Sequence, residues 1–392
     1  MLKNLLGILT GCFSIFRRRC VYGIIGLLIV LFNLHGNAFA MEAESRIILD
    51  EDFNWLTPES ADRTLAKIKD AGFNIFVPCV WHGRGTTWPS LQAPREPLWQ
   101  KRYRPGYDPL AYLIKRGHEL GIEIHPWVTV NLRQREFLAE FVDDGTPEKS
   151  FNVHLPEYRI FIINLMLEVI SKYDVDGINL DYIRTLGICT SDYCVRDYRE
   201  RTGRNLVKDS VLLRVSTDAW ENIAQWNSSA IDDLVFTFAN SARKIKPELV
   251  ISVDSHAGLN ALRLQGTDSI KWANNGWIDA IFHMDYKEEI NKTVFDSAIK
   301  QMQDPRKLVL MVGNYEKAIL NKDNVWPREA DRLNELLYLA QSYGQDGIGV
   351  ALYEYRFLTN SQVKAIKSGP FKDPARPWWV KERGLNGITA PK

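Results

Sequence analysis

The segment 174–184 reads DVDGINLDYIR, and the fold prediction starts from it. It begins as a tight turn after the helical run 154–173, continues as an apolar strand over residues 177–180, and then presents the carboxylate of Asp181. In a barrel of alternating strands and helices, the carboxyl ends of the strands form the catalytic face. We therefore expect Asp181 to take part in chemistry, although a carboxylate here can also cap the following loop or pair with Arg184.

Strand-like and helix-like runs alternate along the rest of the chain, which is typical of a parallel sheet with crossover helices. Helix ends carry their usual signals, such as Thr57 before Pro58 at a start and Gly72 after an end. The predicted strands are residues 46–49, 74–80, 122–130, 177–180, 249–253, 280–282, 307–312 and 347–352. The predicted helices are residues 58–71, 108–120, 154–173, 193–202, 220–246, 294–302, 327–343 and 359–367. This pattern predicts an α/β fold with one domain, a (β/α)8 TIM barrel.

The 392 residues divide into a leader, the barrel and a tail. Residues 1–40 have the pattern of a signal peptide: a basic cluster at 17–19, an apolar run at 21–34 and small residues at 38–40. The apolar run is shorter than a spanning helix, so cleavage is preferred to a signal anchor, while LTGC at 9–12 resembles a lipoprotein box. We expect an exported protein, periplasmic or extracellular, that is membrane-bound only if this leader is uncleaved or lipidated.

The barrel is assigned to residues 41–369, and residues 370–392 are expected to form a surface tail or to be partly disordered. The 49 basic and 48 acidic residues nearly balance, which gives no indication of nucleic-acid binding.

Cys189 and Cys194 can form a small disulfide in an oxidising compartment or remain two thiols. A zinc site is disfavoured because no other Cys or His lies near them. Cys79 is expected in the core.

Nearly every predicted strand ends in polar or aromatic side chains, which a barrel gathers on one rim. Glycosidic bond cleavage needs two carboxyl groups, one protonated to serve the leaving oxygen and one ionised to attack or to activate water. We predict Asp181 as one catalytic group, with Glu354 or Asp285 as its partner. Aromatic rings such as those of Trp81 and Trp88 can offer apolar faces to sugars. The predicted substrate contacts are His82, Arg84, His125, Trp127, Arg184, Asp254, Tyr286 and Tyr353.

Several of these residues also have a structural interpretation. Asp50 and Asp52 can cap the first loop, His125 can be a hydrogen-bonded core histidine, and the arginines can neutralise nearby acids. A metal-dependent hydrolase is an alternative, with ligands drawn from His82, His125, His256, His283, Asp181 and Asp285. No close-spaced metal motif such as HxH or HExxH is present, so we predict neither a metal nor another cofactor. A barrel that binds glycans without cleaving them is a further alternative.

Five segments, in their order and spacing over residues 46–368, together resemble the bacterial glycosyl-hydrolase-like family 10. They are DPL at 108–110, GIEIHPW at 121–127, DGINLDYIR at 176–184, IDAI at 278–281 with MDY at 284–286, and GVALY at 349–353. The resemblance implies an exported TIM-barrel hydrolase of a bacterial envelope glycan, either peptidoglycan strands or exopolysaccharide. It also matches Asp181 to the acid at the end of the family's fourth strand. The chain departs from the family at Tyr182, where many members have a second acid, at Thr185-Leu186 and at His283. A chitinase-like site is disfavoured because Ile183 stands where its acid is expected.

Overall fold

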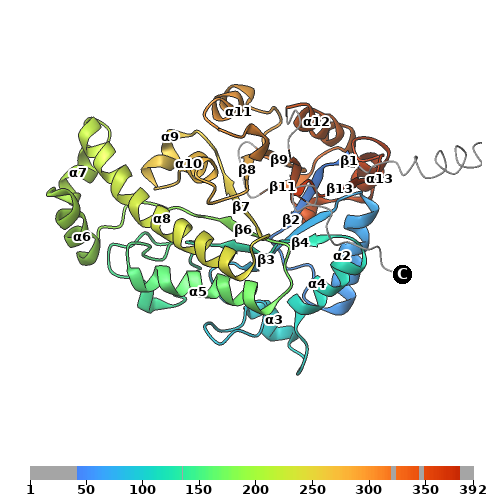
Figure 1. Cartoon of the computed structure of the whole chain (residues 1–392), viewed down its shortest axis with the longest axis horizontal. Coiled ribbons are helices and arrows are strands. Elements are labelled where there is room, and N and C mark those ends of the chain that lie inside the picture. The colour runs from blue at the N-terminus through green and yellow to red at the C-terminus, as the bar shows by residue number, and fades with distance from the viewer. Residues whose placement is uncertain (1–41, 135, 319–323, 344–347, 380–392) are drawn as a thin grey trace, which may run out of the picture. The chain divides into compact units, whose positions relative to one another are not determined.

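The computed structural model describes residues 42–134, 136–318, 324–343 and 348–379 (Figure 1). The predicted leader and residues 380–392 of the tail lie outside these ranges. The residues from Ala43 onward form one compact unit.

The described residues form a closed parallel barrel with eight strand positions, which confirms the TIM-barrel prediction. Around the barrel, the strands lie in the order β2, β12, β9, β8, β7, β6, β5, β3, and pairing between β2 and β3 closes the ring. The third position is split by His125 and Pro126 into β4 and β5, both of which pair with β3. The strands are β2 (Ser45–Asp50), β3 (Ile75–Trp81), β4 (Glu123–Ile124), β5 (Trp127–Thr129), β6 (Gly177–Asp181), β7 (Val250–Ser255), β8 (Ala280–Asp285), β9 (Leu308–Gly313) and β12 (Gly349–Tyr353).

The predicted helices are present with small shifts at their ends. They are α2 (Pro58–Asp70), α4 (Pro109–Glu119), α5 (Pro156–Lys172), α6 (Asp192–Thr202), α8 (Thr217–Ile245), α11 (Lys292–Ile299), α12 (Ala330–Tyr343) and α13 (Asn360–Ser368). The capping signal before α2 is realised, since Thr57 and Ser60 form a reciprocal capping box. Figure 1 shows α5 and α8 side by side on one flank of the barrel. None of the described helices has the length and apolar character needed to cross a membrane.

Short elements in the connections were not predicted. They are α3 (Pro97–Arg102), α7 (Leu206–Leu212), α9 (Asn260–Leu264), α10 (Ser269–Asn274), β10 (Tyr315–Lys317) and β11 (Val325–Pro327). The predicted start of a helix at Pro327 is wrong. Residues 325–327 pair antiparallel with residues 315–317 in a hairpin, and α12 begins only at Ala330. A proline signals a helix start only where the chain before it is free of such pairing.

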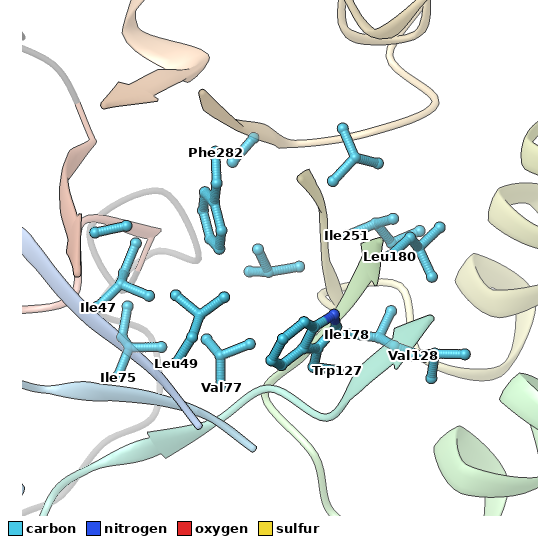
Figure 2. Close-up of a cluster of buried hydrophobic side chains, with 14 of the residues drawn as sticks. Ile47, Leu49, Ile75, Val77, Trp127, Val128, Ile178, Leu180, Ile251 and Phe282 are labelled. Atoms are coloured by element: carbon cyan, nitrogen blue, oxygen red, sulfur yellow. The ribbon is translucent and has the colours of Figure 1, made fainter. Parts of the chain in front are cut away.

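Strand register determines which side chains face the barrel interior. Paired residues of neighbouring parallel strands point to the same side, and successive residues point to opposite sides. Leu49 is aligned with Val77, and Figure 2 shows both side chains together with Trp127 and Phe282 in one buried cluster. A residue therefore faces inward if it pairs with one of these four or lies an even number of positions from one of them in the same strand. The residues between them face the helices.

The described part of the tail packs against the barrel. Trp379 is buried, its Nε1–H donates to Glu123 Oε2 at 2.6 Å, and its ring lies 5.6 Å from that of His125. Glu123 is the first residue of β4, so this cluster lies at the amino-terminal end of the barrel. Trp379 thus belongs to the core, although it lies in the segment that was expected to form a surface tail.

Replacing Trp379 with Ala is expected to destabilise the protein by about 3–5 kcal/mol, because a fully packed indole leaves a cavity and Glu123 loses a donor. Urea unfolding followed by tryptophan fluorescence measures the change. Trp378→Ala is the matched control, since Trp378 is only half-buried. Equal stability of the two variants would contradict the assigned packing.

The two cysteines after β6 are joined, since Cys189 and Cys194 form a disulfide. They belong to a small second core that also includes Tyr198 and Trp226, beneath α6 and α8. Cys79 is a buried free thiol in β3, as expected.

Candidate active site

Asp181 is the last residue of β6 and lies on the inward side, in step with Trp127 through Asn179. Its side chain is buried, and its Oδ1 accepts the N–H of Tyr182. Burial raises the pKa of Asp181 to about 6, against the opposing effect of Arg184, and the negative charge of Glu51 adds to the increase. A carboxyl group with this pKa can hold a proton close to neutral pH.

Glu51 directly follows β2 and is the acidic residue whose charge acts on Asp181. Its Oε1 lies 3.1 Å from His82 Nε2, and its Oε2 accepts a hydrogen bond from the Tyr353 hydroxyl. Burial favours a higher pKa for Glu51, but these interactions with His82 and Tyr353 outweigh it and lower the pKa. Glu51 therefore remains ionised where Asp181 is inclined to hold a proton.

Sequence reasoning missed Glu51, because it considered only the acids on either side of it, Asp50 and Asp52, as possible caps of the first loop. Asp50 does cap the loop, because its oxygens accept both the backbone N–H and the side-chain N–H of Asn54 at 2.7 Å. The available signal was alternation: Glu51 is two residues after the inward-facing Leu49, whereas Asp50 points to the opposite side.

Asp254, a predicted substrate contact, adds a third inward carboxyl group. Its Oδ1 accepts an N–H from the Asn179 side chain at 2.9 Å, and Asn179 also donates to Ser252. Burial raises the pKa of Asp254 well above its usual value, and the charge of Asp181 raises it further. Asp181 and Asp254 therefore share a buried polar layer in which both cannot easily be ionised at once.

Aromatic rings surround these acids. Tyr353 stacks on Tyr286 with ring centroids 4.9 Å apart, and it meets Trp127 edge-on at 6.3 Å and Tyr315 at 6.0 Å. Such rings offer apolar faces next to hydrogen-bonding groups, which is how proteins commonly hold sugars. Trp81 and Trp88 are fully buried, so they do not serve as the rim platforms expected from the sequence. The predicted contact Trp127 is also only 2% exposed, because its ring belongs to the buried core of the barrel.

The predicted basic contacts have different environments. Arg184 lies beside Asp181, half-buried, with its guanidinium 4.9 Å from the centre of the Tyr182 ring. His82 contacts Glu51, as described above. Arg84 is engaged by the buried Glu96, which lies 2.8 Å from its guanidinium, and this ion pair limits its availability to a substrate. His125 lies in the amino-terminal cluster with Glu123, so the structure places it away from the rim.

The two predicted catalytic partners of Asp181, Glu354 and Asp285, lie in different surroundings. Glu354 is buried and bound to Arg356 at 3.0 Å; burial, with the charges of Glu51 and Asp52, raises its pKa to about 8. Asp285 is out of step with the inward-facing Phe282 and accepts the N–H of Asn291 at 2.6 Å, which makes it a loop cap on the outer side. The outward position follows from β8 continuing to Asp285, beyond its predicted end.

The metal-dependent alternative gains no support from the described residues. They contain no group of three or more His, Cys, Asp or Glu that could hold a metal ion. His82 lies at the rim, His125 lies at the amino-terminal end, and His256 and His283 face each other with ring centroids 6.5 Å apart. The candidate ligands are thus divided among separate places in the fold.

A cleft of about 750 Å³ opens next to the aromatic rings. It lies between the loop after β8 and the β10–β11 hairpin, and Tyr286 and Tyr315 form its inner wall. The other lining residues are Lys287, Glu288, Glu289, Ile290, Asn291, Glu316, Lys317 and Arg328.

Comparisons with known proteins agree with this architecture. The chain is 25% identical over 233 residues to "Glycosyl hydrolase DigH" of Escherichia coli O6:H1, which is 50% of each chain. It is 26% identical over 158 residues to "Glycosyl hydrolase YngK" of Bacillus subtilis, covering 36% of this chain and 28% of that one. The chain thus spans about half the length of DigH and less of YngK.

Among solved structures, α-L-fucosidase isoenzyme 2 from Paenibacillus thiaminolyticus superposes with a TM-score of 0.54 at 14% identity. The match covers 88% of this chain and 49% of that one and reflects the shared barrel fold. The sequence profile of the family described as Glycosyl hydrolase-like 10 matches residues 47–150 and 129–328. Because these matches together span well over half of the chain, the protein belongs to the glycosyl hydrolase-like 10 family.

Proposed function

We propose that this protein is a glycoside hydrolase that cleaves a glycan of the bacterial envelope, either peptidoglycan strands or an exopolysaccharide. Asp181 donates a proton to the leaving oxygen, and Glu51 is the ionised partner that attacks the sugar or activates water. The observation that carries the proposal is the contrast between these two acids. Burial raises the pKa of Asp181 to about 6, whereas the close contact with His82 and the hydrogen bond from Tyr353 hold the pKa of Glu51 below its usual value. Environments that separate the pKa values of neighbouring carboxyl groups typically assign acid and base roles.

The surroundings of the acid pair support a carbohydrate substrate. Tyr286 and Tyr353 place rings beside the carboxyl groups, and Asp254 and Arg184 add hydrogen-bonding groups. The family membership and the names of the relatives agree with this chemistry.

Export is part of the proposal. It rests on the signal-peptide pattern of residues 1–40 and on the Cys189–Cys194 disulfide, a bond that persists in oxidising compartments. An envelope glycan is the substrate such a protein would meet. Fractionation of cells that express the full chain, with detection of the protein in the periplasm or medium, tests this part. Recovery in the cytoplasm alone would contradict it.

The direct test is hydrolysis. The purified protein is incubated with peptidoglycan glycan strands freed of stem peptides and, separately, with poly-N-acetylglucosamine and other exopolysaccharides. We expect new reducing ends from at least one of these polymers. Retention of a polymer without new reducing ends would instead support the glycan-binding alternative, and loss of activity to a chelator with recovery on metal addition would support the metal-dependent one.

The pH dependence follows from the two assigned roles. Activity requires protonated Asp181 and ionised Glu51, so kcat/KM should follow a bell with its alkaline limb near pH 6 and its acidic limb below the usual pKa of a glutamate. Initial rates of reducing-end formation across pH 3–9, in buffers of constant ionic strength, measure the profile. A rate that keeps rising above pH 7 would exclude Asp181 as the proton donor.

A further inference from the structure

Asp254 lies beside Asp181 on the inner face of the barrel. The register of β6 and β7 aligns Leu180 with Val253, so the next residues of the two strands, Asp181 and Asp254, are also neighbours. Paired residues of parallel strands point to the same side, and neighbouring strands lie about 4.8 Å apart. Both side chains are buried. Two carboxyl groups are therefore packed side by side, largely shielded from water.

The contacts of Asp254 favour an uncharged carboxyl group. Within the described ranges, this group accepts one hydrogen bond, from the Asn179 side chain at 2.9 Å, and forms no ion pair. On the side of β8, Asp254 is aligned with the apolar Phe282, which Figure 2 shows in the core. A buried carboxylate needs a cation or several donors to offset the loss of water. With one neutral donor, Asp254 is better accommodated as an acid that keeps its proton.

The charged and titratable neighbours of Asp254 agree with this state. Asp181 on β6 repels a second negative charge, and the opposing effect of Arg184 on the Asp254 pKa is weaker than burial and than the charge of Asp181. Tyr286, which follows β8, stays neutral, because burial and the charges of both aspartates raise its pKa. No neighbour on either side thus compensates a charge on Asp254 fully.

A protonated aspartate has one oxygen that accepts a hydrogen bond and one O–H that donates. In Asp254, Oδ1 accepts the Asn179 N–H, which leaves Oδ2 to carry the proton. In the neighbouring Asp181, Oδ1 accepts the N–H of Tyr182, so its other oxygen is available to accept the Asp254 O–H. Hydrogen bonds of this kind become strong when the acceptor is ionised.

We propose that Asp254 is a positioning residue, which as an uncharged acid donates a hydrogen bond to Asp181 and orients the proton donor of the reaction. The inference rests on the proposed function and adds a third carboxyl group to it. When the Asp181 proton passes to the leaving oxygen, Asp181 becomes a carboxylate, and the Asp254 O–H stabilises the new charge. Asp254 keeps its own proton throughout, so only the proton of Asp181 moves in this step.

Two substitutions of Asp254 separate a neutral donor from a charged group. Asparagine imitates a protonated aspartate, because its oxygen can accept the Asn179 N–H and its own N–H can donate to Asp181. We expect Asp254→Ala to lower kcat for glycan cleavage by about 10–100-fold, and Asp254→Asn by only about threefold. A loss in the Asn variant as large as that in the Ala variant would overturn the inference, since it would show that the charge of Asp254 is needed.

The pH profile of kcat/KM distinguishes this role from a merely structural one. In Asp254→Ala the alkaline limb should move upward by about one pH unit, because an Asp181 carboxylate without its donor takes up a proton more readily. In Asp254→Asn the limb should stay near pH 6. Ser252→Ala is the matched control: Ser252 also accepts an N–H from Asn179 but does not titrate, so its removal should leave the limb in place. Equal limbs in the Ala variant and the wild type would contradict the hydrogen bond to Asp181.

Thermal unfolding tests the proton of Asp254 without a substrate. The folded pKa of Asp254 lies above its usual value of 3.8, so its contribution to stability is complete below pH 3.8 and is lost as the pH rises through the folded pKa. Asparagine does not ionise, so the melting temperature of Asp254→Asn should rise relative to the wild type from pH 4 to pH 8. Asp285→Asn, which changes an outward loop cap, should show no such rise.

The two measurements separate the failure of this inference from the failure of the proposed function. If the wild type cleaves none of the glycans, the proposed function fails, and the melting comparison still decides whether Asp254 keeps its proton. A melting difference between Asp254→Asn and the wild type that stays constant or falls with pH would reject a protonated Asp254. If the wild type is active and this difference does not rise, the inference alone is wrong.

Discussion

Asp181→Asn is expected to lower kcat for glycan cleavage by about 10²–10⁴-fold, because an amide cannot donate the proton that the leaving oxygen needs. The folded structure should survive the change. Asn retains an oxygen that can accept the N–H of Tyr182, and it introduces no charge into a site where Asp181 is already buried. Reducing-end assays at saturating substrate measure the loss of rate.

The pKa of Asp181 also predicts the direction in which the Asp181→Asn substitution changes stability. The folded pKa of Asp181 is raised to about 6 from a usual value of 3.8, so its contribution to stability is complete below pH 3.8 and is lost as the pH rises through 6. Asparagine does not ionise, so the variant does not lose stability as the pH rises through 6. It should therefore melt no lower than the wild type at pH 8. Asp285→Asn is the matched control, because that carboxyl group faces outward and caps a loop. Full activity of the Asp181 variant, or an equal loss in the control, would remove Asp181 from the mechanism.

Glu51→Gln is the second large effect, with an expected loss of about 10³-fold in kcat. The glutamine can still accept the Tyr353 hydroxyl, but it carries no negative charge to stabilise a positively charged sugar at the transition state and is a poor nucleophile or base. Rates measured at the pH optimum of the wild type, together with KM, separate this effect from weaker binding.

The matched control for Glu51 is Glu354→Gln. Glu354 is almost completely buried and bound to Arg356, whereas the Glu51 side chain is 29% exposed and can reach a ligand. We expect a much smaller loss in the Glu354 variant. The reverse pattern, an active Glu51 variant and an inactive Glu354 variant, would give the partner role to Glu354, as the sequence suggested.

The barrel could be predicted from sequence because its signals are local. Alternating apolar runs, Thr57 before Pro58, and the turn before Gly177 each mark an element without knowledge of its neighbours. The same is true of Asp181, which stands at the end of an apolar strand. Predicting that the strand ends form one rim required only that the strands be parallel.

The parts that sequence reasoning missed depend on register and on distant contacts. Asp285 was counted as a rim residue because β8 was predicted to end at Phe282; the strand continues, and alternation turns Asp285 outward. His125 lies in the break between β4 and β5, and its ring contacts that of Trp379, more than 250 residues later. Alternation after Leu49 could have placed Glu51 on the inward side, but its ionised state depends on His82 and Tyr353, which only the folded barrel brings to it.

The central claim is that a glycosidic bond lies between Asp181 and Glu51, and a crystal structure of the Asp181→Asn protein with a bound oligosaccharide tests it most directly. We expect the glycosidic oxygen within hydrogen-bonding distance of the residue 181 side chain, with Glu51 beside the anomeric carbon and the sugar ring against Tyr286 or Tyr353. An oligosaccharide bound in the barrel mouth with its glycosidic oxygens away from both residues would contradict the account.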